Sequence, residues 1–115
     1  MIPIWPCAPF NGFVVKRVWI TSYRTIEPYA DDTASSGLIL VVYRVASDGE
    51  DELGRLDTAK EGIAAFTPVV ITGQADLDLE LRAGEGLALN ATRLGLKAPS
   101  LRGFAAQVDW QYVGS

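Results

Sequence analysis

The sequence LILVVYRVA, residues 38–46, is a nearly continuous apolar run of the length of one β-strand. Most of its residues are β-branched or aromatic, and these residue types are enriched in strands. Turn-forming residues bound the run, with Ser35-Ser36-Gly37 before it and Ser47-Asp48-Gly49 after it. Because polar residues hardly interrupt the run, it predicts a central strand that is buried on both faces.

Segments on both sides of this run alternate apolar and polar residues, which is typical of strands with one buried face. The clearest are residues 13–21, 77–82, 87–93 and 104–113. Simple alternation in the first puts Val14, Lys16, Val18 and Ile20 on one face and Phe13, Val15, Arg17, Trp19 and Thr21 on the other. In the last, one face carries Phe104, Ala106, Val108, Trp110 and Tyr112, and the other carries Gln107, Asp109 and Gln111.

Shorter patterns complete the expected fold. Residues 53–57 and 69–72 indicate two more strands, and residues 59–66 fit one helical turn or a loop. About seven short strands, separated by regular turn signals and without a long helix, predict an all-β antiparallel β-sandwich. A jelly roll is the connectivity that we expect for it.

The first twelve residues differ from the rest because three prolines break them while large apolar side chains remain. We therefore divide the chain into an extended Pro-rich arm, residues 1–12, and a single β-sandwich domain, residues 13–115. The arm either covers an open edge of its own sandwich or contacts a neighbouring subunit, since exposed apolar clusters often mark interaction sites. The candidate assembly contacts are Ile2, Ile4, Trp5 and Phe10.

Charge and hydropathy exclude some partners. The 115 residues carry a formal net charge of -4, and the basic residues are scattered, so we expect no nucleic-acid partner. The longest apolar run is far shorter than the roughly 20 residues of a membrane-spanning helix. The N-terminus lacks the basic region of a signal peptide. The sequence therefore predicts neither membrane insertion nor export.

Catalytic residue combinations are missing from the sequence. There is no histidine, the usual base that activates a nucleophile, and Cys7 is the only cysteine. Asp76, Asp78 and Glu80 share a strand face, but carboxylates spaced this way are more typical of a solvated surface than of a calcium site. We predict a protein that is not an enzyme and has no catalytic residues, cofactor or metal site.

Aromatic side chains are the remaining candidates for recognition. Trp19 and Trp110 lie in apolar strand patterns, which favours a place in the core or in an interface. Tyr23 and Tyr29 lie in a long polar loop, residues 22–37, and are candidate ligand-facing side chains. A sugar- or receptor-binding module would have to use that loop.

Six segments of the sequence are similar to those of a known protein family. They are Gly12-Phe-Val-Val-Lys-Arg-Val, Gly37-Leu-Ile-Leu-Val-Val-Tyr-Arg, Leu53-Gly-Arg-Leu-Asp-Thr58, Phe66-Thr-Pro68, Leu81-Arg-Ala-Gly-Glu-Gly-Leu-Ala-Leu89 and a closing strand to Tyr112. In this order the chain resembles small jelly-roll virion proteins of tailed bacteriophages, of the head decoration, cement or head-fibre type. The likeness spans residues 12–113. It departs from the family at residues 93–97, where one glycine stands in place of a Gly-x-Gly turn.

The resemblance implies a structural role without catalytic residues. It implies a capsid decoration or cement protein that is made in the host cytoplasm and located on the capsid surface of the virion. Its partners would be the major capsid protein or other virion subunits, and its copies would form a homo-oligomer, often a trimer. The alternative is a receptor- or carbohydrate-binding β-sandwich module of a phage fibre or tail.

Overall fold

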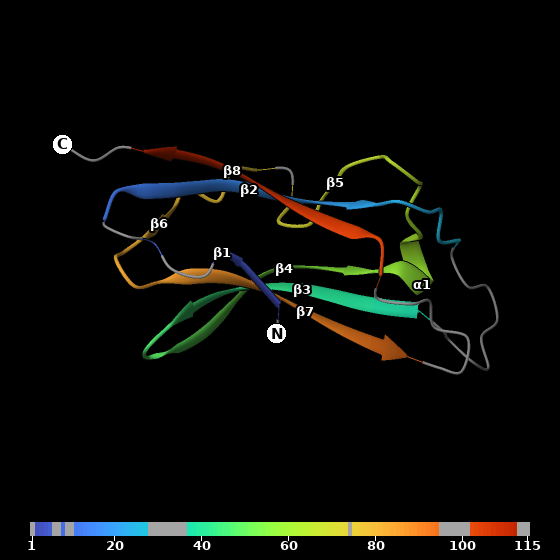
Figure 1. Ribbon diagram of the computed structural model, residues 1–115, viewed down its shortest axis with the longest axis horizontal. Helices are drawn as coiled ribbons and strands as arrows, with labels where there is room; N and C mark the ends of the chain where they lie inside the picture. The colour runs from blue at the N-terminus through green and yellow to red at the C-terminus, as the bar shows by residue number, and fades with distance from the viewer. Residues whose placement is uncertain are drawn as a thin grey trace.

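The computed structural model describes residues 2–5, 8, 11–27, 37–73, 75–94 and 102–112. Most of these residues lie in strands, which confirms the all-β prediction (Figure 1). The elements are β1 (Ile2–Trp5), β2 (Phe13–Ser22), β3 (Gly37–Ala46), β4 (Gly49–Asp57), α1 (Thr58–Glu61), β5 (Val69–Val70), β6 (Leu79–Leu81), β7 (Gly86–Leu94) and β8 (Phe104–Tyr112).

Two antiparallel sheets face each other and form the predicted sandwich (Figure 1). The first sheet has the order β1-β7-β3-β4. In the second sheet β2 is central: β8 pairs with it along its whole length, so β5 and β6 share its opposite edge. The pairing of β2 with β8 encloses the pairing of β3 with β7 along the chain, while β3 and β4 form a hairpin within the first sheet.

A β-bulge in β2 changes which of its side chains face the core. Val15 lies opposite Trp110 and the next pair joins Arg17 to Asp109, so Lys16 is an extra residue on β2. A bulge reverses the alternation beyond it. Val15 and Val18 are therefore both fully buried. The simple alternation that grouped Val14 with Val18 and Ile20 is wrong for this reason.

β3 lies between β7 and β4 and supplies the centre of the core. Leu38, Leu40 and Val42 are buried against the second sheet, and Val41 is also buried on the other face. The later residues, 43–46, are half-buried. The expected burial on both faces is thus correct for the first half of the strand. At least 14 buried apolar residues form one core cluster between the sheets.

The acidic segment after β3 belongs to a strand and not to a turn alone. β4 begins at Gly49, four residues before the start expected from the apolar pattern, and Glu50, Asp51 and Glu52 pair with the end of β3. At its other end, Asp57 caps α1 by accepting a hydrogen bond from the Ala59 backbone N–H at 3.0 Å. The predicted helical turn is therefore α1, which has four residues.

The described part of the N-terminal arm lies on its own sandwich. β1 pairs antiparallel with β7, with Ile2 opposite Leu89, and Ile4 packs against the core. Further along, the Ala8 backbone N–H donates to the Glu85 carbonyl oxygen at 2.8 Å. These contacts match the alternative in which the arm covers an open edge of its own sheet. Phe10 lies outside the described residues.

Candidate interaction surface

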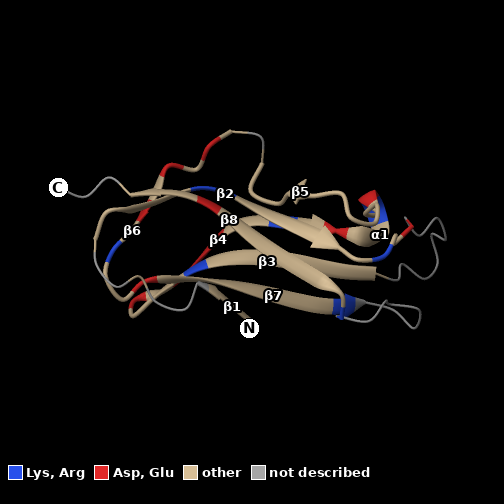
Figure 2. Cartoon of the chain, turned by 45° about the horizontal axis from the view of Figure 1, so that its top comes forward, with Lys and Arg blue, Asp and Glu red and all other residues tan. Residues whose placement is uncertain are grey.

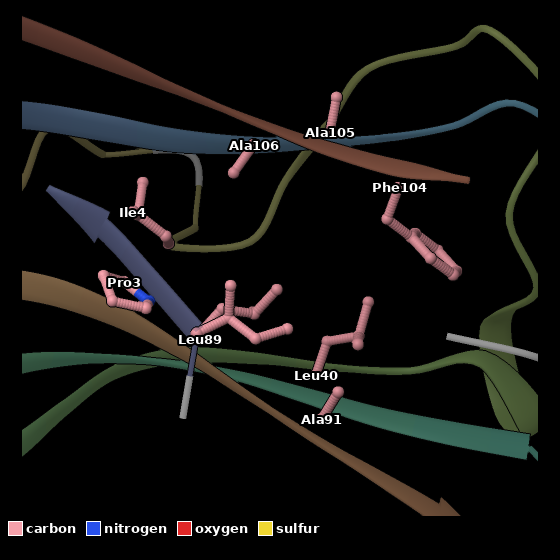
Figure 3. A pocket seen from close by; sticks show the side chains of 9 residues that line it. Pro3, Ile4, Leu40, Leu89, Ala91, Phe104, Ala105 and Ala106 are labelled. Carbon is pink, nitrogen blue, oxygen red and sulfur yellow. The ribbon is translucent and has the colours of Figure 1, made fainter. Parts of the chain in front are cut away.

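The side of the sandwich between β1 and β8 is open, and the interior is accessible there as an apolar pocket of about 270 Å³ (Figure 3). The four-residue strand β1 and the nine-residue strand β8 both line this pocket. In the first sheet Leu40, Leu89 and Ala91 point up into it, while Phe104 and Ala106 approach from β8. The lining residues are Ile2, Pro3, Ile4, Leu40, Leu89, Ala91, Phe104, Ala105 and Ala106.

One face of β8 continues the apolar surface beyond the pocket. The register of the β2–β8 ladder confirms that alternate β8 residues share the face that looks toward the first sheet. We call this set the β8 stripe: Phe104, Ala106, Val108, Trp110 and Tyr112. Trp110 is 50% exposed and Tyr112 is 48% exposed. Trp110, for which sequence favoured the core or an interface, is therefore not a core residue.

Aromatic contacts hold the far end of the β8 stripe in place. The Phe13 ring lies 5.1 Å from the Trp110 ring and 5.5 Å from the Tyr112 ring, both in tilted arrangements. Such tilted contacts at these distances are favourable. Phe13 itself is buried, so it anchors the two half-exposed rings from beneath. These contacts place the exposed Trp110 and Tyr112 rings against the edge of the core.

β8 is also an edge strand. Among the strands that the structure describes, it pairs with β2 and with no second strand. On the opposite face of the sheet, Asp109 accepts a hydrogen bond from the Trp19 indole N–H at 3.2 Å. Asp109 is the only charged residue in the nine positions of β8. This edge therefore combines a long strand, low charge and an exposed apolar face.

A second aromatic surface lies where the loop after β2 meets the segment before β5. Tyr23 and Phe66 are 57% and 71% exposed, and their rings stack with centroids 5.9 Å apart and an interplanar angle of 21°. Phe66 has φ 56°, which is unusual and strained for a bulky residue. Hydrogen bonds hold both backbones: Tyr23 N–H donates to the Gly103 carbonyl and Phe66 N–H to the Ser22 carbonyl, each at 2.8 Å.

Salt bridges hold five of the described carboxylates, those of Asp51, Glu52, Asp76, Asp78 and Glu85. Arg17 donates to Asp76 at 3.0 Å, and Lys16, the extra residue of the bulge, binds Asp78, which raises the pKa of the Lys16 ammonium. These pairs join β2 to two of the three carboxylates, Asp76, Asp78 and Glu80, whose spacing we judged more typical of a solvated surface than of a calcium site. No cluster of three metal-ligating side chains occurs among the described residues. Among the described residues, Lys and Arg do not gather into one patch in Figure 2.

The residues that the sequence predicted as assembly or ligand contacts differ in their exposure and position in the structure. Ile2 is 53% exposed at the pocket rim, whereas Ile4 is turned into its own core. The backbone of Trp5 ends β1. Tyr23 belongs to the aromatic pair with Phe66, a partner that sequence reasoning missed, and Tyr29 lies outside the described residues.

No protein-family model, curated protein or solved structure matches this chain. Within the described residues, no helix has the length and apolar character needed to cross a membrane. The class that the fold defines is an antiparallel β-sandwich with an open apolar side. Its functional interpretation rests on that side and on the Tyr23–Phe66 pair.

Proposed function

We propose that this protein is a structural virion protein, a decoration or cement protein that binds and stabilises a tailed-phage head shell through subunit contacts. The observation that carries the proposal is the open apolar side, formed by the pocket between β1 and β8 and by the β8 stripe. Large aromatic side chains at the centre of a preorganised apolar patch are the usual anchors of protein interfaces.

A shell-bound role is physically favourable because a shell repeats the same weak contact many times. A patch of this kind gains about 25 cal/mol for each Å² of apolar surface that it removes from water. One such contact can be weak, but a shell repeats it by symmetry, and each bound copy stabilises the shell to which it binds. The major capsid protein or another virion subunit is therefore the partner that we propose. The net charge of -4 also disfavours contact with packaged DNA.

Cosedimentation tests this function. The purified chain is mixed with empty expanded head shells of the phage whose genome encodes it, and both pelleting and the melting temperature of the shells are measured. Ala106→Asp, which places a carboxylate in the exposed wall of the apolar pocket, should abolish pelleting and stabilisation. Glu50→Gln on β4, the far edge of the first sheet, is the matched control and should bind normally.

Two outcomes would refute the proposal. Wild-type chain that stays in the supernatant at saturating concentrations would exclude shell binding. Equal binding by wild type and Ala106→Asp, with both folded by circular dichroism, would exclude the open side as the contact.

A carbohydrate- or receptor-binding role is the second candidate, and the Tyr23–Phe66 pair supports it. Two exposed, nearly parallel rings, with an interplanar angle of 21°, offer aromatic surface to a ligand. Flat aromatic surfaces suit the apolar faces of sugar rings, because they offer contact area with little side-chain entropy to lose. A glycan array compared between wild type and Tyr23→Ala tests it. Specific hits lost in the variant would support this role, and an array without hits would remove it for those sugars.

A further inference from the structure

We propose that two copies of this chain associate through β8, whose antiparallel pairing with β8 of the second copy joins their second sheets into one continuous sheet. This inference names a partner for the same open side on which the proposed function rests. Pairing of exposed edge strands is a common mode of protein association, because backbone hydrogen bonds supply affinity and alternate side chains supply specificity. A two-fold axis at the centre of β8 would make the interface isologous and closed.

The edges of the two sheets are protected to different extents. Charged side chains and prolines discourage an edge strand from pairing with other chains. β4, the outer edge of the first sheet, carries five charged residues, which are Glu50, Asp51, Glu52, Arg55 and Asp57. β1, the other edge of that sheet, has four residues and contains Pro3. β8 has nine residues, no proline and a single charge, so it is the long edge that lacks these protections.

The sequence of β8 complements itself in the register that pairs all nine residues. That register places Val108 opposite its own copy, because it is the middle of Phe104–Tyr112. On the inward face, Ala106 then lies opposite Trp110 and Phe104 opposite Tyr112. A large side chain thus meets a small one beside the axis, and two aromatic residues meet at each end. Aromatic cross-strand pairs are among the favourable pairs in antiparallel sheets.

The charges of β8 fit this register as well. Asp109 lies opposite Gln107 of the second copy, so the two carboxylates do not face each other across the interface. Like charges directly opposite each other would destabilise the pair. Asp109 also keeps its hydrogen bond from the Trp19 indole, which fixes the carboxylate on the outward face. A chain with a net charge of -4 would otherwise oppose self-association.

The pocket gives the pairing a second consequence. Ala106 forms part of the pocket wall, and in this register Trp110 of the second copy lies beside it. An indole that is half exposed in one chain would thus be placed next to the open apolar cavity of the other. A two-fold dimer would also carry two pocket rims, which lets it bridge neighbouring subunits of a shell and gain from bivalent attachment.

The test measures the mass of the full chain, 12.4 kDa as a monomer, by sedimentation equilibrium over a range of concentrations. Wild type should approach twice that mass. Gln107→Asp places two pairs of like charges across the interface and should raise the dimer dissociation constant about tenfold, whereas Gln107→Lys creates two opposite-charge pairs and should lower it. Both changes are at an exposed position, so they should leave the fold intact by circular dichroism.

Gln111→Lys is the matched control. It is exposed on the same outward face but lies opposite Ala105 in this register, so it should change the dissociation constant less than threefold. A chain that stays monomeric at millimolar concentration, a trimer, or equal effects of Gln107→Asp and Gln107→Lys would overturn the inference. No shell is present in this experiment. Failure here therefore leaves shell binding standing, and a dimer without shell binding would leave this inference standing alone.

Discussion

Trp110 lies directly opposite Val15 in the β2–β8 ladder, yet Val15 is fully buried and Trp110 is 50% exposed. Opposite residues in an antiparallel pair point to the same face, so both side chains point toward the first sheet. They differ because β2 is central in the second sheet whereas β8, among the described strands, is its edge.

Substitutions at these two positions should separate stability from binding. Val15→Ala leaves a cavity in the core and should lower the free energy of unfolding by about 1–3 kcal/mol. Trp110→Ala should lower it by about 1–2 kcal/mol, less than the roughly 3–5 kcal/mol expected of a buried tryptophan, because half of the side chain is already in water. Urea denaturation measures both. A loss above 3 kcal/mol for Trp110→Ala would make Trp110 a core residue and contradict the assignment of the open side.

The two layers approach each other closely at Gly54 of β4. A Cβ atom there would be 2.1 Å from the Ile71 carbonyl oxygen, in the turn after β5. Because a backbone atom cannot move aside as a flexible side chain can, Gly54→Ala should destabilise the fold by about 3 kcal/mol, the upper end of the usual overpacking range. Thermal unfolding measures the effect.

Gly73→Ala provides the comparison for Gly54. Its added Cβ would meet no atom within 4 Å, but its φ of 91° strains any other residue. It should therefore cost only the backbone term of about 1–2 kcal/mol. Equal losses in the two variants would show that steric contact between the layers is not what requires glycine at Gly54.

The backbone strain at Phe66 predicts a difference between two variants. A left-handed conformation costs an L-residue about 1–2 kcal/mol, and the greater chain entropy of glycine offsets about 0.5–1 kcal/mol of the relief. Phe66→Gly should therefore be about 0.5–1 kcal/mol more stable than Phe66→Ala, although both lose the ring that stacks on Tyr23. Chemical denaturation of the pair checks this. A more stable alanine variant would mean that the residue is not held at positive φ.

The Glu52–Arg55 pair on β4 predicts a pH dependence. Arg55 donates to the Glu52 carboxylate at 2.5 Å, and this hydrogen bond lowers the pKa of Glu52 below its ordinary value of 4.5. A carboxyl whose pKa is lower in the folded state adds stability above its unfolded pKa and loses that contribution as the pH falls through the folded pKa. Wild type should thus exceed Glu52→Gln in stability at pH 7, and the difference should vanish in acid.

Urea denaturation of both proteins between pH 7 and pH 3 measures this difference. The effect should shrink at 1 M salt, because the pair is exposed and salt screens exposed charges. In an Arg55→Gln background the substitution at Glu52 should have no such pH dependence. A difference that grows in acid would reverse the sign and refute the assignment.

The sequence predicted best those strands in which the burial of each side chain follows directly from the local apolar pattern. The apolar run of β3 and the alternation of β8 both follow from the period of a pleated strand, and the register confirms them. The change in side-chain alternation after the bulge in β2 was not predictable in this way. The extra residue, Lys16, has no signal in the composition, because a bulge is defined only by the pairing with the neighbouring strand.

The candidate surface was harder to predict than the fold. Period-two alternation marks which β8 residues share a face, but it does not say whether another sheet covers that face. The exposure of Trp110 depends on its place in an edge strand, which the local pattern does not reveal. Phe66 was missed because its positive φ and its contact with Tyr23 are tertiary features. An apolar residue next to Thr67-Pro68 in a loop was the only local signal.

Amide hydrogen exchange, compared between the free chain and the chain bound to head shells, tests the central claim most directly. Because pairing between copies would already protect the β8 amides in the free chain, β1 decides the test: if the open side is the interaction surface, exchange should slow in β1 on binding, while the acidic edge strand β4 should exchange as in the free chain. Slowed exchange in β4 with β1 and β8 unchanged, or no change anywhere at saturation, would contradict the account.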